Sequence, residues 1–281
     1  MIIGIGEWGF RELPMEEHFR VAKKFGFRHM EFGIGGGFPG RLPEKPSDVE
    51  VANLKALSRK YAITVEHCCL ENDFTLDDPA AHHEMVKKTM SQIRAAGRAG
   101  AVRVRLFAGF TAVPQMTPER WGRMLDAFEM CDTICQDNGM RIAIETHGAI
   151  TQNADGTTTH VNTVTTDRAS LQRLLRDLPA TIGFNYDPAN LKAVSPEDKL
   201  CAVDLLAART DYCHLKDWKC MANGWAACAI GEDDLDYVPI FKKMTYDGVY
   251  FVEYEPTGDL EAGIRRSLDY LHTAAPGYTF D

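Results

Sequence analysis

The sequence contains no uncharged apolar run long enough to cross a bilayer, and it has no excess of basic residues. Its 281 residues include 31 Lys and Arg against 40 Asp and Glu, which gives a formal net charge of −9. Because contacts with phosphate need a basic face, this balance argues against a nucleic-acid partner. The first residues lack the basic segment and apolar run of a signal peptide, so we expect a cytoplasmic protein with no membrane association.

Two further patterns are missing. The eight cysteines follow neither a disulfide framework nor the C-x-x-C spacing of a zinc site, so we expect reduced thiols. After the first apolar run the chain reads Gly6-Glu7-Trp8-Gly9, which does not match the glycine motif of a dinucleotide-binding fold. No linker, internal repeat or low-complexity segment interrupts the chain, which predicts one domain over residues 1–281.

Short apolar, β-branched runs alternate with longer amphipathic stretches along the whole chain. The expected strands are residues 1–6, 28–33, 63–68, 102–109, 141–146, 181–187, 211–216 and 249–254. The expected helices are residues 15–26, 48–62, 80–100, 118–139, 167–179, 197–210, 235–248 and 259–273. Strict alternation predicts a parallel sheet, and eight units without a central break favour an α/β (β/α)8 TIM barrel over an open doubly wound sheet.

The two longest loops are expected at residues 147–165 and 217–233. Both follow strands of the second half, so we assign them to the end of the barrel where the strands finish. Active sites of TIM barrels lie at that end.

Polar side chains stand at the ends of the last four expected strands. Glu145 ends the fifth strand, Asp187 the sixth, His214 lies in the seventh and Glu253 ends the eighth. In a barrel such residues face one pocket, so we expect the four to surround one point. Three carboxylates that close would repel one another unless a cation lay among them. Octahedral Mn²⁺ or Mg²⁺ suits this set better than a structural Zn²⁺, because the set has no thiolate and leaves two positions open.

Four short motifs carry a resemblance to a known family. They are Ala-Ile-Glu145-Thr-His147-Gly, Asp187-Pro-Ala-Asn190-Leu, His214-Leu-Lys216-Asp217 and Val-Glu253-Tyr. With them, the chain resembles the xylose isomerase-like TIM-barrel superfamily, the sugar phosphate isomerase/epimerase group. That group includes ketose 3-epimerases, hydroxypyruvate isomerase and inosose dehydratase, and more distantly the endonuclease IV type of DNA repair enzyme.

The resemblance implies roles for the four strand-end residues. Glu145, Asp187, His214 and Glu253 would bind one divalent metal ion, with Mn²⁺ as first choice and Mg²⁺, Co²⁺ or Zn²⁺ as alternatives. Glu145 and Glu253 would also flank the substrate as the acid/base pair. Barrels of this family often pair, so a homo-oligomer is a further expectation.

Two departures from the family pattern concern the substrate loops. Asp233 stands where the family often has the second glycine of a Gly-x-Gly stretch, and Asn190 lies in the region where ketose 3-epimerases tend to have histidine. Asn190 weakens a specific assignment as a ketose 3-epimerase, and Asp233 argues against carrying over the family's substrate-loop details at that position.

Five more residues are candidates for substrate binding. They are Trp8, His67, His147, Asn190 and Lys216, each at or just beyond the end of an expected strand. Trp8 could form an apolar wall for a sugar ring, and Lys216 shares the side of its strand with His214. Arg105 and Glu31 lie within strands, where a supporting role as buried partners is expected.

The expected chemistry is removal of a proton from the carbon next to a carbonyl, through a metal-stabilised enediolate of a small-molecule sugar, keto-sugar or cyclitol. Return of the proton gives an isomerase or epimerase, which we expect first. Loss of a β-substituent gives a lyase or dehydratase acting on an inosose or a 3-keto-glycoside, which is the alternative. An endonuclease IV type hydrolase is the remote alternative, since it would need several more histidine ligands and a basic surface. A non-catalytic barrel is the remaining hypothesis.

Overall fold

The computed structural model describes residues 1–281, and its centre is a closed barrel of eight parallel strands. The strands are β1 (Ile2–Ile5), β2 (His29–Ile34), β3 (Thr64–Leu70), β4 (Arg103–Leu106), β5 (Arg141–Glu145), β8 (Gly183–Tyr186), β9 (Thr210–Leu215) and β12 (Val249–Val252). They pair in chain order, and β12 closes the barrel against β1. The prediction of a (β/α)8 TIM barrel is confirmed.

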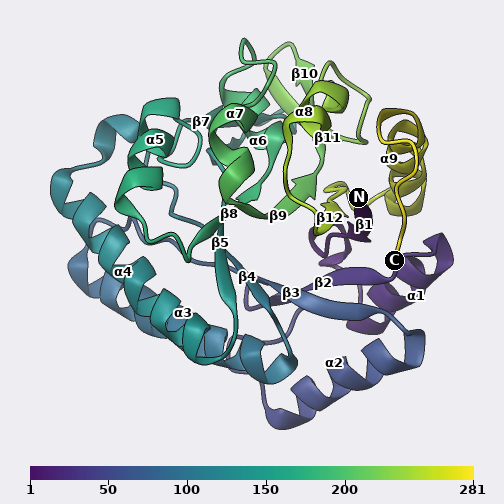
Figure 1. The fold of residues 1–281 in the computed structure, drawn as a ribbon, viewed down its shortest axis with the longest axis horizontal. Helices are drawn as coiled ribbons and strands as arrows, with labels where there is room; N and C mark the ends of the chain where they lie inside the picture. The colour runs from purple at the N-terminus through teal and green to yellow at the C-terminus, as the bar shows by residue number, and fades with distance from the viewer.

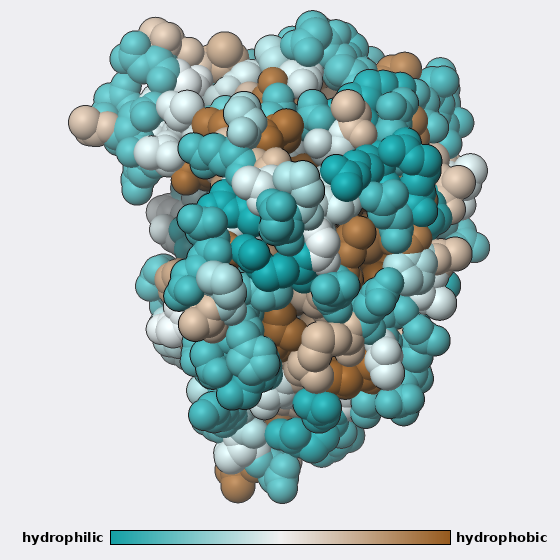
Figure 2. Space-filling model, turned by 90° about the vertical axis from the view of Figure 1, so that its left-hand side faces the viewer, coloured by the Kyte–Doolittle hydropathy of each residue, from teal (hydrophilic) through white to brown (hydrophobic).

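Helices surround the barrel (Figure 1). They are α1 (Met15–Phe25), α2 (Asp48–Tyr61), α3 (Pro79–Ala99), α4 (Pro118–Asp137), α5 (Arg168–Asp177), α6 (Pro188–Val194), α7 (Val203–Leu206), α8 (Tyr237–Lys243) and α9 (Leu260–Ala274). Ser47 and Glu50 form a capping box at the start of α2, and Gly26 ends α1 with a φ of 88°. Figure 2 shows hydrophilic residues over most of one outer side, with apolar side chains in small separate groups.

The core has two parts. A cluster of 66 buried residues fills the space between the strands and the helices. A small cluster of Ala143, Tyr212, Val249 and Phe251 fills the inside of the barrel. Gly4 belongs to the same interior, because a Cβ there would lie 2.7 Å from the Phe251 ring. The inside of the barrel is therefore a packed floor beneath the carboxyl ends of the strands.

The two stretches expected as long loops form a second sheet instead. Its strands are β6 (Ala149–Gln152), β7 (Thr158–Val161), β10 (Asp217–Met221) and β11 (Gly224–Cys228), in the order β10-β11-β7-β6. Two hairpins build it: the turn of the first contains Asp155-Gly156, which is a typical hairpin sequence, and the turn of the second is Ala222-Asn223. In Figure 1 the labelled strands β7, β10 and β11 of this sheet lie across the barrel from α2.

The sequence prediction was wrong for the sixth unit of the barrel. The helix expected at 197–210 is reduced to α7 and a short 3-10 turn, because Cys201 and Ala202 adopt positive φ angles of 47° and 52°. Helix α6 was not predicted, although Asp187 and Pro188 are a typical N-cap and first helical residue. No helix in the structure has the length and the apolar character that a membrane span requires.

Candidate active site

Side chains from four neighbouring strands converge at the carboxyl end of the barrel. Glu145 is the last residue of β5, Asp187 follows β8, His214 lies in β9 and Glu253 follows β12. Each offers a ligand atom, and these atoms all lie within 4.8 Å of one another. All four residues are buried. The structure thus brings together the four residues that the sequence grouped.

His214 is oriented by a carboxylate from the opposite side of the barrel. Its Nε2 lies 2.7 Å from Oε1 of Glu31 on β2, so this nitrogen carries its proton toward the carboxylate. The Tyr212 hydroxyl donates to the same oxygen, at 2.5 Å. The other ring nitrogen, Nδ1, faces Glu145 and Glu253 at 3.6 and 3.5 Å. Glu31 therefore turns Nδ1 of the imidazole toward the cluster.

An arginine holds Glu145 in place. Arg105 on β4 places Nε 3.0 Å from Oε2 of Glu145, and its Nη2 lies 3.5 Å from Glu71. Arg41 continues this buried chain of charges, with nitrogens 2.9 Å from Glu71 and 3.2 Å from Glu7. The expected supporting role of Arg105 is thus seen as a direct ion pair with a cluster residue.

A lysine occupies the other side of the cluster. The Lys216 Nζ lies 2.7 Å from Glu255, 3.0 Å from Glu253 and 3.2 Å from Asp187. Its side chain is 3% exposed, so these carboxylates replace water around the ammonium group. Lys216 thereby offsets part of the repulsion among the carboxylates.

Burial and charge shift the proton affinities of these groups in opposite directions. Burial raises the pKa of Asp187 to about 7, against the opposing charge of Lys216. Burial also acts to raise the pKa of Glu145, but Arg105 and His214 outweigh it and hold that pKa below its usual range. For His214, the carboxylates of Glu253, Glu31 and Glu145 outweigh burial and raise the pKa well above its ordinary value.

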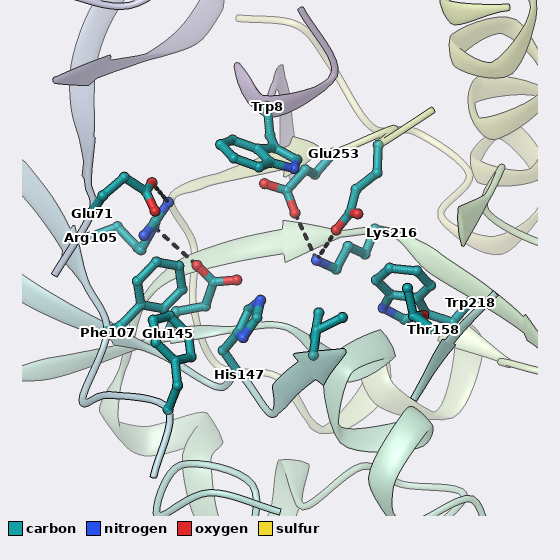
Figure 3. Close-up of a pocket in the computed structure, with 13 residues that line it drawn as sticks. Trp8, Glu71, Arg105, Phe107, Glu145, His147, Thr158, Lys216, Trp218 and Glu253 are labelled. Carbon is teal, nitrogen blue, oxygen red and sulfur yellow. Dashed lines mark hydrogen bonds and ion pairs between the residues drawn. The ribbon is translucent and has the colours of Figure 1, made fainter. Parts of the chain in front are cut away.

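A cavity of about 310 Å³ opens above the cluster (Figure 3). In Figure 3 the carboxyl groups of Glu145 and Glu253 point into the same space, with Arg105 beside the first and Lys216 beside the second. The lining residues are Trp8, Glu71, Arg105, Phe107, Phe110, Glu145, His147, Ile150, Thr158, Lys216, Trp218, Glu253 and Glu255. Asp187 and His214 lie beneath this surface, since both are completely buried.

Three of the five expected substrate-binding residues line the cavity, namely Trp8, His147 and Lys216. His67 lies elsewhere: its ring packs against Tyr212 and Phe251, at 4.7 Å from each, and it borders another cavity near the start of β4. The reason is that β3 continues to Leu70, so Glu71, four residues beyond His67, reaches the cavity instead.

Asn190 also lies outside the cavity. Its amide nitrogen donates to Asp187 and to the Thr146 carbonyl, at 3.0 and 3.1 Å, and its oxygen accepts from the indole of Trp218. The polar atoms of the Asn190 side chain are thus hydrogen-bonded within the protein, because α6 directs this residue back toward Asp187, the N-cap of the helix.

Sequence reasoning missed several lining residues. Glu71 would follow from a longer estimate of the third strand, Phe107 lies within the fourth strand expected at 102–109, and Trp218 lies just after the His214-Leu-Lys216-Asp217 motif. Thr158 and Ile150 come from the second sheet, whose position over the barrel has no signal in the sequence.

The donor set fits a divalent cation. Three carboxylates and one imidazole converge on one point, and the only nearby thiol, Cys69, groups with His214 and Glu31 on the far side of the ring. Oxygen and nitrogen ligands of this kind suit Mn²⁺, Mg²⁺ or a catalytic Zn²⁺.

Several solved structures share this fold. The 3-keto-D-glucoside 4-epimerase YcjR from E. coli, in its apo form, is 16% identical, with a TM-score of 0.69 over 97% of this chain and 99% of that one. The probable 3-DHS dehydratase AsbF from Bacillus anthracis is 14% identical, with a TM-score of 0.73 over 96% and 98%. A xylose isomerase-like TIM barrel protein from Mycobacterium smegmatis in complex with magnesium is 14% identical, with a TM-score of 0.70 over 97% of each chain.

No curated protein matches the chain in sequence. A family model does, over residues 19–274, and its description is xylose isomerase-like TIM barrel. The matched range covers the barrel from α1 to α9 and includes all four cluster residues. The chain therefore belongs to the xylose isomerase-like TIM barrel family.

Proposed function

We propose that this protein is a divalent-metal-dependent isomerase or epimerase for a small sugar, keto-sugar or cyclitol. The observation that carries the proposal is the convergence of Glu145, Asp187, His214 and Glu253 within 4.8 Å at the floor of a cavity. Related folds include a sugar epimerase and a magnesium complex, which supports the substrate class and the cofactor.

The four cluster residues would hold the ion, for which Mn²⁺ is our first choice. A divalent ion there would polarise a substrate carbonyl and so acidify the neighbouring C–H bond. Magnesium in a related structure makes Mg²⁺ the leading alternative.

Glu145 and Glu253 would move the proton. Both carboxyl groups point into the cavity, one from β5 and the other from the end of β12, so a sugar carbon between them would present a face to each. One of the two groups, as a carboxylate, would remove the proton, and the other, as a carboxylic acid, would give its own proton to the opposite face, which inverts the carbon. Return of the proton to the neighbouring carbon would interconvert aldose and ketose.

Trp8 and Trp218 would orient the ring. Both indoles line the cavity, and the apolar face of a sugar packs well on such a surface. Lys216 would hold Glu253 in position through its contact at 3.0 Å.

A lyase is the second candidate, and His147 favours it. This imidazole lines the cavity together with both glutamates, which provides a third group for the departing β-substituent. Burial lowers the pKa of His147, so the ring would first have to take up the proton removed from the α-carbon and would then give it to the departing group. Product analysis separates the two candidates, because an isomerase conserves the mass of the sugar and a lyase releases water or an aglycone.

The test is uptake of solvent deuterium at the α-carbon of a ketose, measured by NMR with the manganese-loaded protein. We expect exchange in the unchanged protein and a loss of about 100-fold or more in both Glu145→Gln and Glu253→Gln. Glu84→Gln is the matched control, since Glu84 is an exposed carboxylate on α3. Exchange that survives in both cavity variants would contradict the proposal.

A further inference from the structure

The ammonium group of Lys216 is already surrounded by carboxylates of the protein. It has three N–H bonds, and Glu255, Glu253 and Asp187 lie 2.7, 3.0 and 3.2 Å from the nitrogen. A phosphate in the cavity would have to displace one of these carboxylates and would then stand beside the other two.

Arg105, the other cation of the cavity, is also engaged. Its Nη1 donates to the Leu70 carbonyl at 2.8 Å, while Nε and Nη2 face Glu145 and Glu71. The Phe107 ring covers the guanidinium, with its centre 4.0 Å from the central carbon. The guanidinium therefore already lies between two carboxylates, which offset its charge toward a phosphate.

TIM barrels frequently bind phosphate through the loops after the seventh and eighth strands. Between β9 and the first turn of α8, side-chain carboxylates occupy backbone donors: Ala229 N–H donates to Glu232, Gly231 N–H to Asp217 and Val238 N–H to Asp236. The loop after β12 adds Glu253, Glu255 and Asp259. Both loops are thus acidic where a phosphate site would be expected.

The outer part of the cavity is apolar. Phe110 and Ile150 line it and are 36% and 37% exposed, so they stand at the mouth. The distal end of a sugar chain bound at the cluster would meet these side chains, and neither can pair with a charge.

We infer that the cavity accepts an uncharged sugar and rejects the phosphate ester of the same sugar, and this rests on the proposed function. Five carboxylates and two cationic side chains make up the cavity and the cluster, so a bound divalent ion still leaves the site negative. Glu255 is the specificity-determining residue, because it makes the shortest contact with Lys216 and is not one of the cluster ligands. The carboxylates are Glu71, Glu145, Asp187, Glu253 and Glu255, and the cations are Arg105 and Lys216.

The test measures binding to the manganese-loaded protein without requiring turnover. Matched pairs are titrated while tryptophan fluorescence is followed, since Trp8 and Trp218 line the cavity. The pairs are fructose and fructose 6-phosphate, tagatose and tagatose 6-phosphate, and ribulose and ribulose 5-phosphate. We expect the neutral member of at least one pair to bind at least about tenfold more tightly than its phosphate.

Glu255→Gln keeps the shape of residue 255 and removes its charge, which leaves the positive charge of Lys216 less fully compensated. In this variant we expect the preference for the neutral sugar over its phosphate to fall about tenfold. Glu84→Gln, far from the cavity on the exposed side of α3, should leave this preference unchanged.

The outcomes separate this inference from the proposed function. Equal or tighter binding of the phosphates by the unchanged protein overturns the inference, and so does the failure of every sugar to bind. A neutral sugar that binds without any exchange of its α-proton supports the inference and contradicts the proposed acid/base chemistry.

Discussion

His214 is held on both sides by carboxylates from different parts of the barrel. The Nε2 atom of His214 lies 2.7 Å from Oε1 of Glu31. The other ring nitrogen, Nδ1, is therefore the one that faces the cluster, 3.5 Å from Oε2 of Glu253. Glu31 itself is completely buried and also accepts from the Glu7 backbone N–H at 3.0 Å. A ligand imidazole fixed in this way binds a metal better than a free one, because its orientation and tautomer are already set.

Replacement of Glu31 by Gln should therefore weaken Mn²⁺ binding by about tenfold to 100-fold. The amide keeps the shape of the side chain but no longer offers two charged oxygens to Tyr212, His214 and the backbone. Isothermal titration with Mn²⁺ measures the effect. Glu66→Gln, an exposed position on neighbouring β3, is the control, and an equal affinity in both variants would show that Glu31 does not position the ligand.

The sequence predicted the four cluster residues because each stands at the end of an apolar run, and the barrel fixes where such ends meet. The sequence analysis correctly expected Arg105 and Glu31 to be supporting residues, but it did not identify the residues that they contact. It misplaced His67 and Asn190, since the length of β3 and the presence of α6 depend on packing that the local pattern does not contain.

At the scale of elements, one buried lysine ties the second sheet to the barrel. Lys192 on α6 has Nζ 2.9 Å from Asp217 at the start of β10 and 2.8 Å from Asp233 in the loop that follows β11. Asp233 also accepts from the backbone N–H of Cys220. The departure from the family glycine at position 233 is thus matched by a cation that pairs with the new carboxylate.

Lys192→Met should destabilise the protein by about 3 kcal/mol, because it leaves Asp217 and Asp233 without their cation in a buried place. Amide exchange should rise in β10 and β11 before it rises in the barrel strands. Urea unfolding and hydrogen-exchange mass spectrometry measure both effects.

Lys199→Met is the matched control for this prediction. Lys199 pairs with Asp234, but both side chains are more than half exposed, so the free energy of unfolding should fall by no more than about 1 kcal/mol. Equal losses in the two variants would show that the buried network does not secure the second sheet.

The barrel strands and most helices could be predicted because apolar periodicity records which face of each element is buried. The second sheet was not predicted, since its strands are short and partly exposed and β7 pairs with β11, far away in the chain. The turn sequence Asp155-Gly156 marks the first hairpin but not its association with the second.

At the scale of the whole molecule, stability depends on histidines that are buried in neutral form. His18 on α1 is 1% exposed, and its Nε2 lies 2.8 Å from the Phe10 carbonyl, to which it donates. Burial lowers the pKa of His18 to about 4 from its ordinary value of 6.5. The unfolded chain therefore takes up this proton at a higher pH than the folded chain.

The stability that His18 contributes should be fully present above pH 6.5 and should fall as the pH drops toward 4. Between about pH 7 and pH 5 the free energy of unfolding of the unchanged protein should fall by about 2 kcal/mol more than that of His18→Gln. Urea unfolding at both pH values gives this difference. His83→Gln, at an exposed position on α3, is the control and should show the same pH dependence of unfolding as the unchanged protein. The prediction would be contradicted if the free energy of unfolding of His18→Gln changed with pH as much as that of the unchanged protein.

The most direct test of the central claim is the anomalous diffraction of a crystal soaked with manganese. The account predicts one strong peak bonded to Glu145, Asp187, His214 Nδ1 and Glu253, at the floor of the cavity beneath Trp8. A map with no peak among these four side chains, or with manganese bound only at other places on the molecule, would contradict it.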